Sequence, residues 1–172
     1  NPPIDSLREN KVMSLKTRFG NLGNILDFDN LTEENIYVLD SPILTNSQFK
    51  KFKKFFSKKV KVIDCTFNIE KSLKERIELI REEAETAVRE GSTCLILSDK
   101  NITNQKASIP SILTVGAVHS HLVKHGLRGY CSLNIECSDA MDTHSFAILI
   151  GVGATTVNPY LAIDSIHQRF EK

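Results

Sequence analysis

The sequence lacks the features that most directly indicate a class of protein. Its 22 basic and 21 acidic residues give a formal net charge of +1, so overall charge favours neither nucleic acid nor an anionic membrane as a partner. No apolar run approaches the roughly 20 residues that span a bilayer. The chain begins with Asn-Pro-Pro-Ile-Asp, which is not a signal peptide, and without Met, which indicates a piece cut from a longer precursor.

Cysteine is sparse and is not arranged in pairs. Cys65, Cys94, Cys131 and Cys137 include no Cys-x-x-Cys spacing, and two of them fall inside predicted strands. Such cysteines are typical of buried free thiols in a reducing compartment rather than of a disulfide or metal framework. We therefore expect the protein to be located in a reducing compartment, either the cytoplasm or a plastid-like organelle.

The familiar short catalytic motifs are absent as well. There is no Gly-x-Ser-x-Gly elbow, no Walker loop and no His-Glu-x-x-His sequence. Gly151 and Gly153 follow an apolar run, as in a dinucleotide fingerprint, but Thr156 stands where the third glycine belongs. A tight turn explains both glycines without a ligand, and a phosphate site is the alternative.

Histidines cluster in one predicted helix without an accompanying acid. His121 and His125 are four residues apart and share a face, whereas His119 and His121 point in different directions. A zinc site needs three or four converging ligands, and this run supplies no carboxylate. We expect partly exposed helix histidines and no metal site.

Three acids follow the end of a predicted strand, which is where catalytic groups collect in α/β folds. They are Glu136, Asp139 and Asp142. Spacing alone does not show that any two of these carboxylates converge. From the residues alone we predict a soluble α/β domain without a self-sufficient active site and without a catalytic residue of its own.

What the sequence does contain is a regular alternation of strand and helix patterns. Strands are predicted at 36–39, 60–65, 94–97, 133–135 and 154–157, with a further candidate at 12–19. Helices are predicted from residue 45 or 46, at 72–90, from 110 to 126 and at 160–170, and 144–150 fits either a short helix or a strand. Crossovers of this length allow parallel pairing.

The predicted fold class is therefore α/β, with a mainly parallel sheet flanked by helices in repeated βα units. About four units do not close an eight-stranded barrel, so the sheet is open or half-barrel-like. The chain is treated as a single domain over 1–172, with an N-terminal segment at 1–45 and βα units at 46–172.

Three predicted helices have apolar stripes that should face the core. The stripes are Phe49, Phe52, Phe55 and Phe56; Leu73, Ile77, Ile80, Ala84 and Ala87; and Ile112, Val115, Val118 and Leu122. On the second helix, Glu85 is spaced to pair with both Arg81 and Arg89. The lysines around the phenylalanines could form a nucleic-acid patch, but the helix needs its aromatic residues for burial.

Several runs resemble the central domain of glutamate synthase, in the right order and over nearly the whole chain. They lie at 1–9, 13–17, 39–46, 109–119, 126–128 and 153–162, the last reading Gly-Ala-Thr-Thr-Val-Asn-Pro-Tyr-Leu-Ala. The chain is similar to the later part of that domain.

The resemblance implies a role within a large enzyme. The large subunit joins a glutaminase domain with a Cys nucleophile, a central domain, a synthase domain carrying FMN and an iron–sulfur cluster, and a β-helix. Ammonia from glutamine passes through a tunnel to 2-oxoglutarate, and the imine is reduced at FMN. The central domain connects the two active sites and is expected to bind no cofactor itself; its partners are the glutaminase and synthase domains, and the isolated chain could self-associate.

Interface or tunnel residues are expected on the runs that carry the resemblance and on two segments that depart from the family pattern. They are Asn1, Pro2, Asp5, Asp99, Lys100, Asp142, His144 and Asn158. Where relatives read Ala-Arg-x-x-His-His-Phe-Ala, this chain has Met141 and Ser145 in place of the Arg and the second His. Lys100 stands where Arg is common, which keeps the charge and loses the planar fork.

Overall fold

A computed structural model describes residues 13–19 and 36–170, and the chain divides into two compact units, Asn1–Pro42 and Ile43–Lys172. In the first unit, β1 (Thr17–Phe19) pairs antiparallel with β2 (Tyr37–Leu39). Phe19 and Leu39 are buried. The strand predicted at 36–39 is confirmed, and the described part of the 12–19 candidate is also a strand.

The second unit contains the alternating elements. Its helices are α2 (Asn46–Phe56), α3 (Leu73–Arg89), α4 (Ser111–Lys124), α5 (Thr143–Gly151) and α6 (Tyr160–Phe170), with single 3₁₀ turns η3 (Ser57–Lys59) and η4 (Arg128–Tyr130). Its strands are β3 (Val60–Asp64), β4 (Thr66–Asn68), β5 (Cys94–Ser98), β6 (Lys106–Ser108), β7 (Ser132–Glu136) and β8 (Thr156–Asn158).

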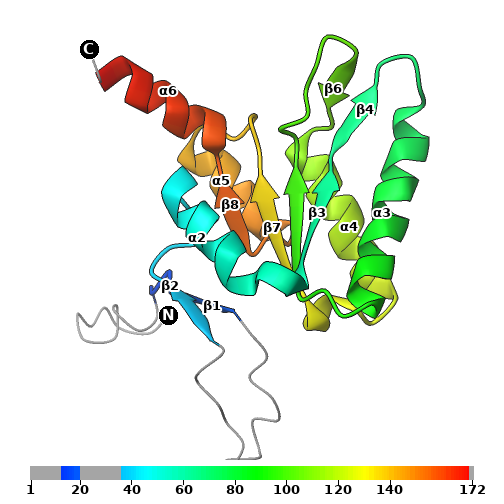
Figure 1. Cartoon of the computed structure of the whole chain (residues 1–172), viewed down its shortest axis with the longest axis horizontal. Coiled ribbons are helices and arrows are strands. Elements are labelled where there is room, and N and C mark those ends of the chain that lie inside the picture. Colours follow the sequence, from blue (N-terminus) through cyan, green and yellow to red (C-terminus); the bar gives the residue numbers. More distant parts are fainter. Residues whose placement is uncertain (1–12, 20–35, 171–172) are drawn as a thin grey trace, which may run out of the picture. The chain divides into compact units, whose positions relative to one another are not determined.

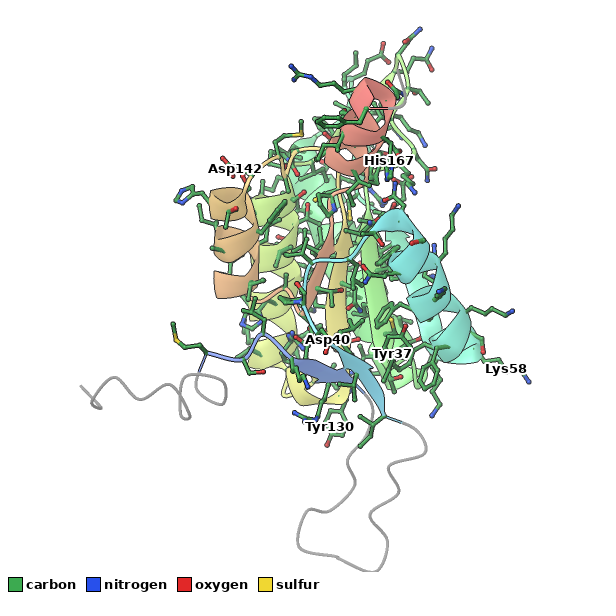
Figure 2. All side chains as sticks on the ribbon, turned by 90° about the vertical axis from the view of Figure 1, so that its left-hand side faces the viewer. Tyr37, Asp40, Lys58, Tyr130, Asp142 and His167 are labelled. Atoms are coloured by element: carbon green, nitrogen blue, oxygen red, sulfur yellow. The ribbon has the colours of Figure 1, made fainter. Side chains whose placement is uncertain are left out.

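Four of these strands form a parallel sheet in the order β3-β5-β7-β8. Because the spatial order follows the sequence order and βαβ crossovers are right-handed, the connecting helices fall on one face. Figures 1 and 2 show α4 and α5 on that face of the sheet and α2 on the opposite face. The predicted α/β class with repeated βα units is confirmed, and the sheet is open as described.

Helix α3 begins and ends where its sequence indicates. The Ser72 hydroxyl accepts a hydrogen bond from the Glu75 amide, and Gly91 adopts a φ of 96° just past the end. Glu85 pairs with Arg89 as predicted. The predicted pair of Arg81 with Glu85 is wrong, because Arg81 pairs with Glu78 instead.

Helix α4 turns its apolar stripe slightly differently from the prediction. Val115, Val118 and Leu122 are fully buried, but Ile112 is 47% exposed. Small polar residues, Ser111 and Thr114, take the inward positions of the first turn. Pro110 caps this helix rather than forming its first residue, and Gly126 ends it with a φ of 69°.

Helix α2 buries only half of its phenylalanines. Thr45 and Gln48 form a capping box at its start. Phe49 and Phe52 are buried, whereas Phe55 is 46% exposed, so the four-residue buried stripe is wrong at that position. Lys58, just beyond the helix, projects away from the sheet (Figure 2). The aromatic rings are therefore mainly used in packing, which argues against a base-stacking surface.

One strand pair was not predicted, and one segment with two predicted alternatives is now assigned. Strands β4 and β6 form an antiparallel pair in segments that look polar, with Thr66 opposite Ser108. The ambiguous 144–150 segment is a helix, because it is part of α5. Each helix of the described residues is too short or too polar to cross a membrane.

Candidate functional site

A row of polar side chains crosses the carboxyl edge of the parallel sheet. Asp64, Ser98, Glu136 and Asn158 are the last residues of the four strands, and each is in register with its neighbours. In open α/β sheets this edge is the usual place for ligands. This edge of the sheet is therefore the first candidate for a functional site.

Glu136 lies at the centre of this edge and is 5% exposed. Its Oε2 accepts a hydrogen bond of 2.7 Å from Ser98 Oγ, and its Oε1 lies 2.8 Å from Lys100 Nζ. The same ammonium lies 4.8 Å from the centre of the Tyr160 ring. Both carboxylate oxygens are thus engaged, and a buried charge with these partners is compensated.

Asp99 is more deeply buried, at 3% exposed, and is only half engaged. Its Oδ2 accepts hydrogen bonds from the Ser138 amide at 2.8 Å and the Ser138 hydroxyl at 2.6 Å. Its Oδ1 has no hydrogen-bond partner among the described residues. Burial, followed by the negative charge of Asp99, raises the pKa of Tyr160 to about 12, so that phenol stays protonated.

Asn158 connects the edge to α2. Its amide nitrogen donates to the Leu44 carbonyl and to Asn46 Oδ1, both at 2.9 Å. At the other end of the row, burial would raise the pKa of Asp64, but hydrogen bonds from Thr66 outweigh it and lower the pKa. Through these bonds the two side chains fix neighbouring backbone segments in place.

The space behind this row is small. A cavity of about 10 Å³ lies among Asp99, Ser111, Glu136 and Cys137, close to the minimum that one water needs. Ser111 hydrogen-bonds the Asp139 carboxylate through its amide and its hydroxyl. The edge is therefore a packed polar cluster and not an open substrate pocket.

The predicted interface residues separate into three groups. Asp99, Lys100 and Asn158 lie together at the edge. Asp142 and His144 lie apart from it, exposed at the start of α5, and Figure 2 shows Asp142 there. Asn1, Pro2 and Asp5 fall outside the described residues.

Asp142 caps α5 through one oxygen. Its Oδ1 accepts from the Ser145 amide and hydroxyl, both at 2.7 Å, and these bonds lower the pKa of Asp142. Ser145 is the residue that replaces the second His of the family pattern, and here its hydroxyl completes the cap. The acids Asp139 and Asp142 thus serve helix starts.

Ser98, Ser138 and Tyr160 were not among the predicted site residues. Ser98 could have been found from its position at the end of a strand, which is equivalent to that of Glu136, an acid that the sequence did single out. Ser138 and Tyr160 had no such signal, because their contacts cross between separate loops.

The two glycines of the Gly151–Gly153 run differ in their surroundings. Gly153 adopts a φ of 120°, and an added Cβ there would lie 2.3 Å from His119 Nδ1. Gly151 has no such constraint, since a Cβ at that position meets nothing within 4 Å. The turn interpretation holds for Gly153. It does not explain Gly151, which ends α5 in an ordinary conformation.

Comparison with known proteins adds the family. The sequence model described as "Glutamate synthase central domain" matches residues 1–172. The chain is 49% identical over 175 residues to the glutamate synthase [NADPH] large chain of Azospirillum brasilense, covering 100% of this chain and 12% of that protein. It is 38% identical over 174 residues to the chloroplastic ferredoxin-dependent glutamate synthase of Spinacia oleracea, covering 98% and 11%.

A third relative, the glutamate synthase [NADH] of Schizosaccharomyces pombe, is 38% identical over 173 residues, covering 96% of this chain and 8% of that protein. This chain thus spans about a tenth of the curated relatives it matches. The resemblance read from the sequence motifs is confirmed: the chain belongs to the glutamate synthase central domain family.

Proposed function

We propose that this chain is a non-catalytic connecting domain of a glutamate synthase, an oxidoreductase that forms two glutamates from glutamine, 2-oxoglutarate and a reductant. It packs between the glutaminase and FMN synthase domains, and part of it lines the ammonia route. The observation that carries this proposal is the carboxyl edge of the sheet, where Glu136 and Lys100 are paired with each other. The edge supports a structural role because its cavity has no room for a substrate.

An apolar groove between α3 and α4 supports the packing role. It is lined by Leu73, Ile77, Ile112, Leu113 and Ala117, and Ile112 and Leu113 are 47% and 42% exposed. Apolar surface that is hollowed and contiguous is typical of interaction sites. We assign this groove to a neighbouring domain of the same enzyme.

The cofactors of the enzyme do not fit this chain. Cys94 and Cys131 lie at the amino end of the sheet, and Cys65 and Cys137 follow strands at the carboxyl end. Five-residue strands separate these ends by roughly 16 Å, so the four thiols do not converge on one iron–sulfur cluster.

A flavin or other phosphate-bearing ligand fits no better. The space that Gly153 leaves open is filled by His119. The acids of the sheet edge also repel an anion. FMN and the cluster are therefore assigned to other domains, and no step of the reaction is assigned to residues here.

The environment of the thiols supports a reducing compartment, either cytoplasm or a plastid-like organelle. Burial raises the pKa of Cys94 and of Cys137 to about 12. The names of several relatives include the word chloroplastic. The relatives' names also differ in electron donor, which this domain does not distinguish.

The packing role is tested in the full-length enzyme with Ile112→Asp. We expect a polar residue in the groove to disturb domain packing and to raise the amount of glutamine hydrolysed per glutamate formed. Val123→Asp is the matched control, since Val123 is 53% exposed on the same helix and does not line the groove. If the amount of glutamine hydrolysed per glutamate formed is unchanged in both variants, the assignment of the groove is wrong.

The non-catalytic role is tested with the isolated chain. We expect no flavin absorbance after gel filtration in the presence of FMN, and no glutaminase activity. Retained flavin would favour the alternative of a stand-alone phosphate- or flavin-binding enzyme.

The tunnel role is tested separately, because it depends on the N-terminal run. Substituting Asn1 or Pro2 in the full-length enzyme is expected to let ammonia escape, so that glutamine hydrolysis exceeds glutamate synthesis. Unchanged coupling counts against a place for this segment on the ammonia route.

A further inference from the structure

Glu85, His121 and His125 meet between α3 and α4, away from the sheet edge. Glu85 belongs to α3, His121 lies in the last turn of α4, and His125 is the residue that caps its end. One oxygen of the carboxylate and one nitrogen of each imidazole all lie within 4.8 Å of one another. The proposed function makes no use of this group.

We propose that Glu85, His121 and His125 bind a divalent transition-metal ion of the zinc type. Two imidazoles and one carboxylate are a donor set that zinc accepts, with water in the fourth position. The two histidines share one helix face, and their own helix supplies no acid to the group. The acid comes from the neighbouring helix, 36 residues away from His121.

The two separations from the Glu85 carboxylate to the imidazoles are close to those of a metal site. Glu85 Oε2 lies 2.6 Å from His121 Nε2 and 3.4 Å from His125 Nδ1. Metal–ligand bonds of about 2.0–2.1 Å at tetrahedral angles separate ligand atoms by about 3.3 Å. The Glu85–His125 distance already fits, and His121 needs to withdraw by about 0.7 Å.

All three side chains have access to solvent. The exposed fractions are 22% for Glu85, 18% for His121 and 35% for His125. An ion can therefore reach the group, and side chains at the surface can make the small adjustment without repacking the core.

Arg89 orients the carboxylate. Its guanidinium binds Glu85 Oε1 through Nε at 2.8 Å and Nη2 at 2.7 Å, which turns Oε2 toward the histidines. A glutamate carboxylate is ionised at neutral pH, as a ligand to a cation needs to be. Partners that orient a ligand in this way are a regular part of metal sites.

Metal binding would break one hydrogen bond and would meet repulsion from a nearby positive charge. His125 Nδ1 lies 3.0 Å from the His121 carbonyl oxygen, and coordination through Nδ1 replaces that hydrogen bond with the other tautomer. The positive charge of Arg89 also opposes a second cation. The competing explanation is a metal-free hydrogen-bond cluster that only joins the two helices.

The test uses the purified 172-residue chain after metal removal by a chelator. Zn²⁺ is titrated by calorimetry, and Co²⁺ is titrated by visible absorption, which reports a tetrahedral nitrogen–oxygen site. We expect one ion per chain, a higher melting temperature with Zn²⁺, and affinity at least about tenfold weaker in Glu85→Gln, His121→Ala and His125→Ala.

Matched controls change residues of the same types elsewhere in the chain. Glu78→Gln changes another acid on α3, and His144→Ala and His167→Ala change exposed histidines on other helices; these should bind Zn²⁺ as the unchanged chain does. Circular dichroism in chelator checks folding. If His121→Ala does not fold, the Zn²⁺ affinity of His125→Ala tests the proposal, because His125 is the more exposed of the two histidines.

Two results overturn the proposal. One is equal Zn²⁺ affinity in the unchanged chain and in folded His125→Ala. The other is a sulfur-to-cobalt charge-transfer band, which would place the ion on cysteine.

Discussion

Gly153 packs directly against the imidazole of His119, so closely that a Cβ at position 153 would lie 2.3 Å from His119 Nδ1. Arg128 binds both residues, donating from Nε to His119 Nδ1 at 3.2 Å and from Nη2 to the Gly153 carbonyl at 2.9 Å. The turn between α5 and β8 is thereby attached to α4. Gly153, which resembles part of a dinucleotide-binding motif in the sequence, makes a packing contact with His119.

Gly153→Ala is expected to destabilise the chain by about 2–4 kcal/mol, because the new methyl group clashes with His119 and the φ of 120° is strained for any other residue. Urea unfolding followed by circular dichroism measures the change.

Gly151→Ala is the control from the same motif. Its Cβ enters open space at the end of α5, so we expect a change within about 1 kcal/mol, in the stabilising direction. Similar losses in both variants would contradict the contact.

Stability should depend on pH through His119. Burial and then the charge of Arg128 hold the pKa of His119 below its ordinary value of 6.5. The unfolded chain then binds more protons, so this contribution is complete above pH 6.5 and is lost as the pH falls through the lower, folded value.

The measurement compares the unchanged chain with His119→Gln, which keeps an acceptor for Arg128 but does not titrate. We expect the free energy of unfolding to fall more steeply in the unchanged chain between about pH 7 and pH 5. Parallel curves for the two chains would show that His119 titrates normally.

The four thiols should react slowly in the folded chain. All are buried, and burial raises the pKa of Cys65 and Cys131 as well as those of Cys94 and Cys137. A pKa of about 12 leaves roughly one thiol in 10⁴ ionised at pH 8. Labelling with a thiol reagent should therefore accelerate by orders of magnitude when urea unfolds the chain; fast labelling of all four without denaturant would be inconsistent with burial.

Lys100→Met is expected to cost about 1–3 kcal/mol, because it leaves the Glu136 carboxylate buried with Ser98 as its remaining partner. The loss is limited because the Lys100 side chain is 48% exposed and water replaces part of the interaction. Chemical denaturation provides the measurement.

The double variant Lys100→Met with Glu136→Gln completes a thermodynamic cycle. Removing the buried charge as well should restore part of the stability lost in Lys100→Met. Strict additivity of the two single changes would show that the pair is not coupled.

Much of the fold was predictable because its signals are local. The caps at Thr45 and Ser72, the stops at Gly91 and Gly126, and the continuous apolar run at 94–97 each act within a few residues. The prediction that Ile112 and Phe55 are buried was wrong, because helical spacing indicates which face of a helix is apolar but not how much of that face the core covers.

The candidate sites were less predictable. Asp99, Lys100 and Asn158 were named from family resemblance, and their convergence depends on strand register. The β4–β6 pair was missed because neither strand shows an alternation of apolar residues strong enough to be recognised.

The class of fold, the main helices and the family could all be predicted from the sequence alone, since hydrophobic period, caps and runs that resemble a known family are properties of neighbouring residues. Only the tertiary structure decided which distant residues meet. Glu85 joins His121 because α3 packs on α4, Gly153 meets His119 because the turn before β8 packs on α4, and Ser98 reaches Glu136 because two parallel strands end in register. Each of these contacts depends on packing between elements, which no local pattern encodes.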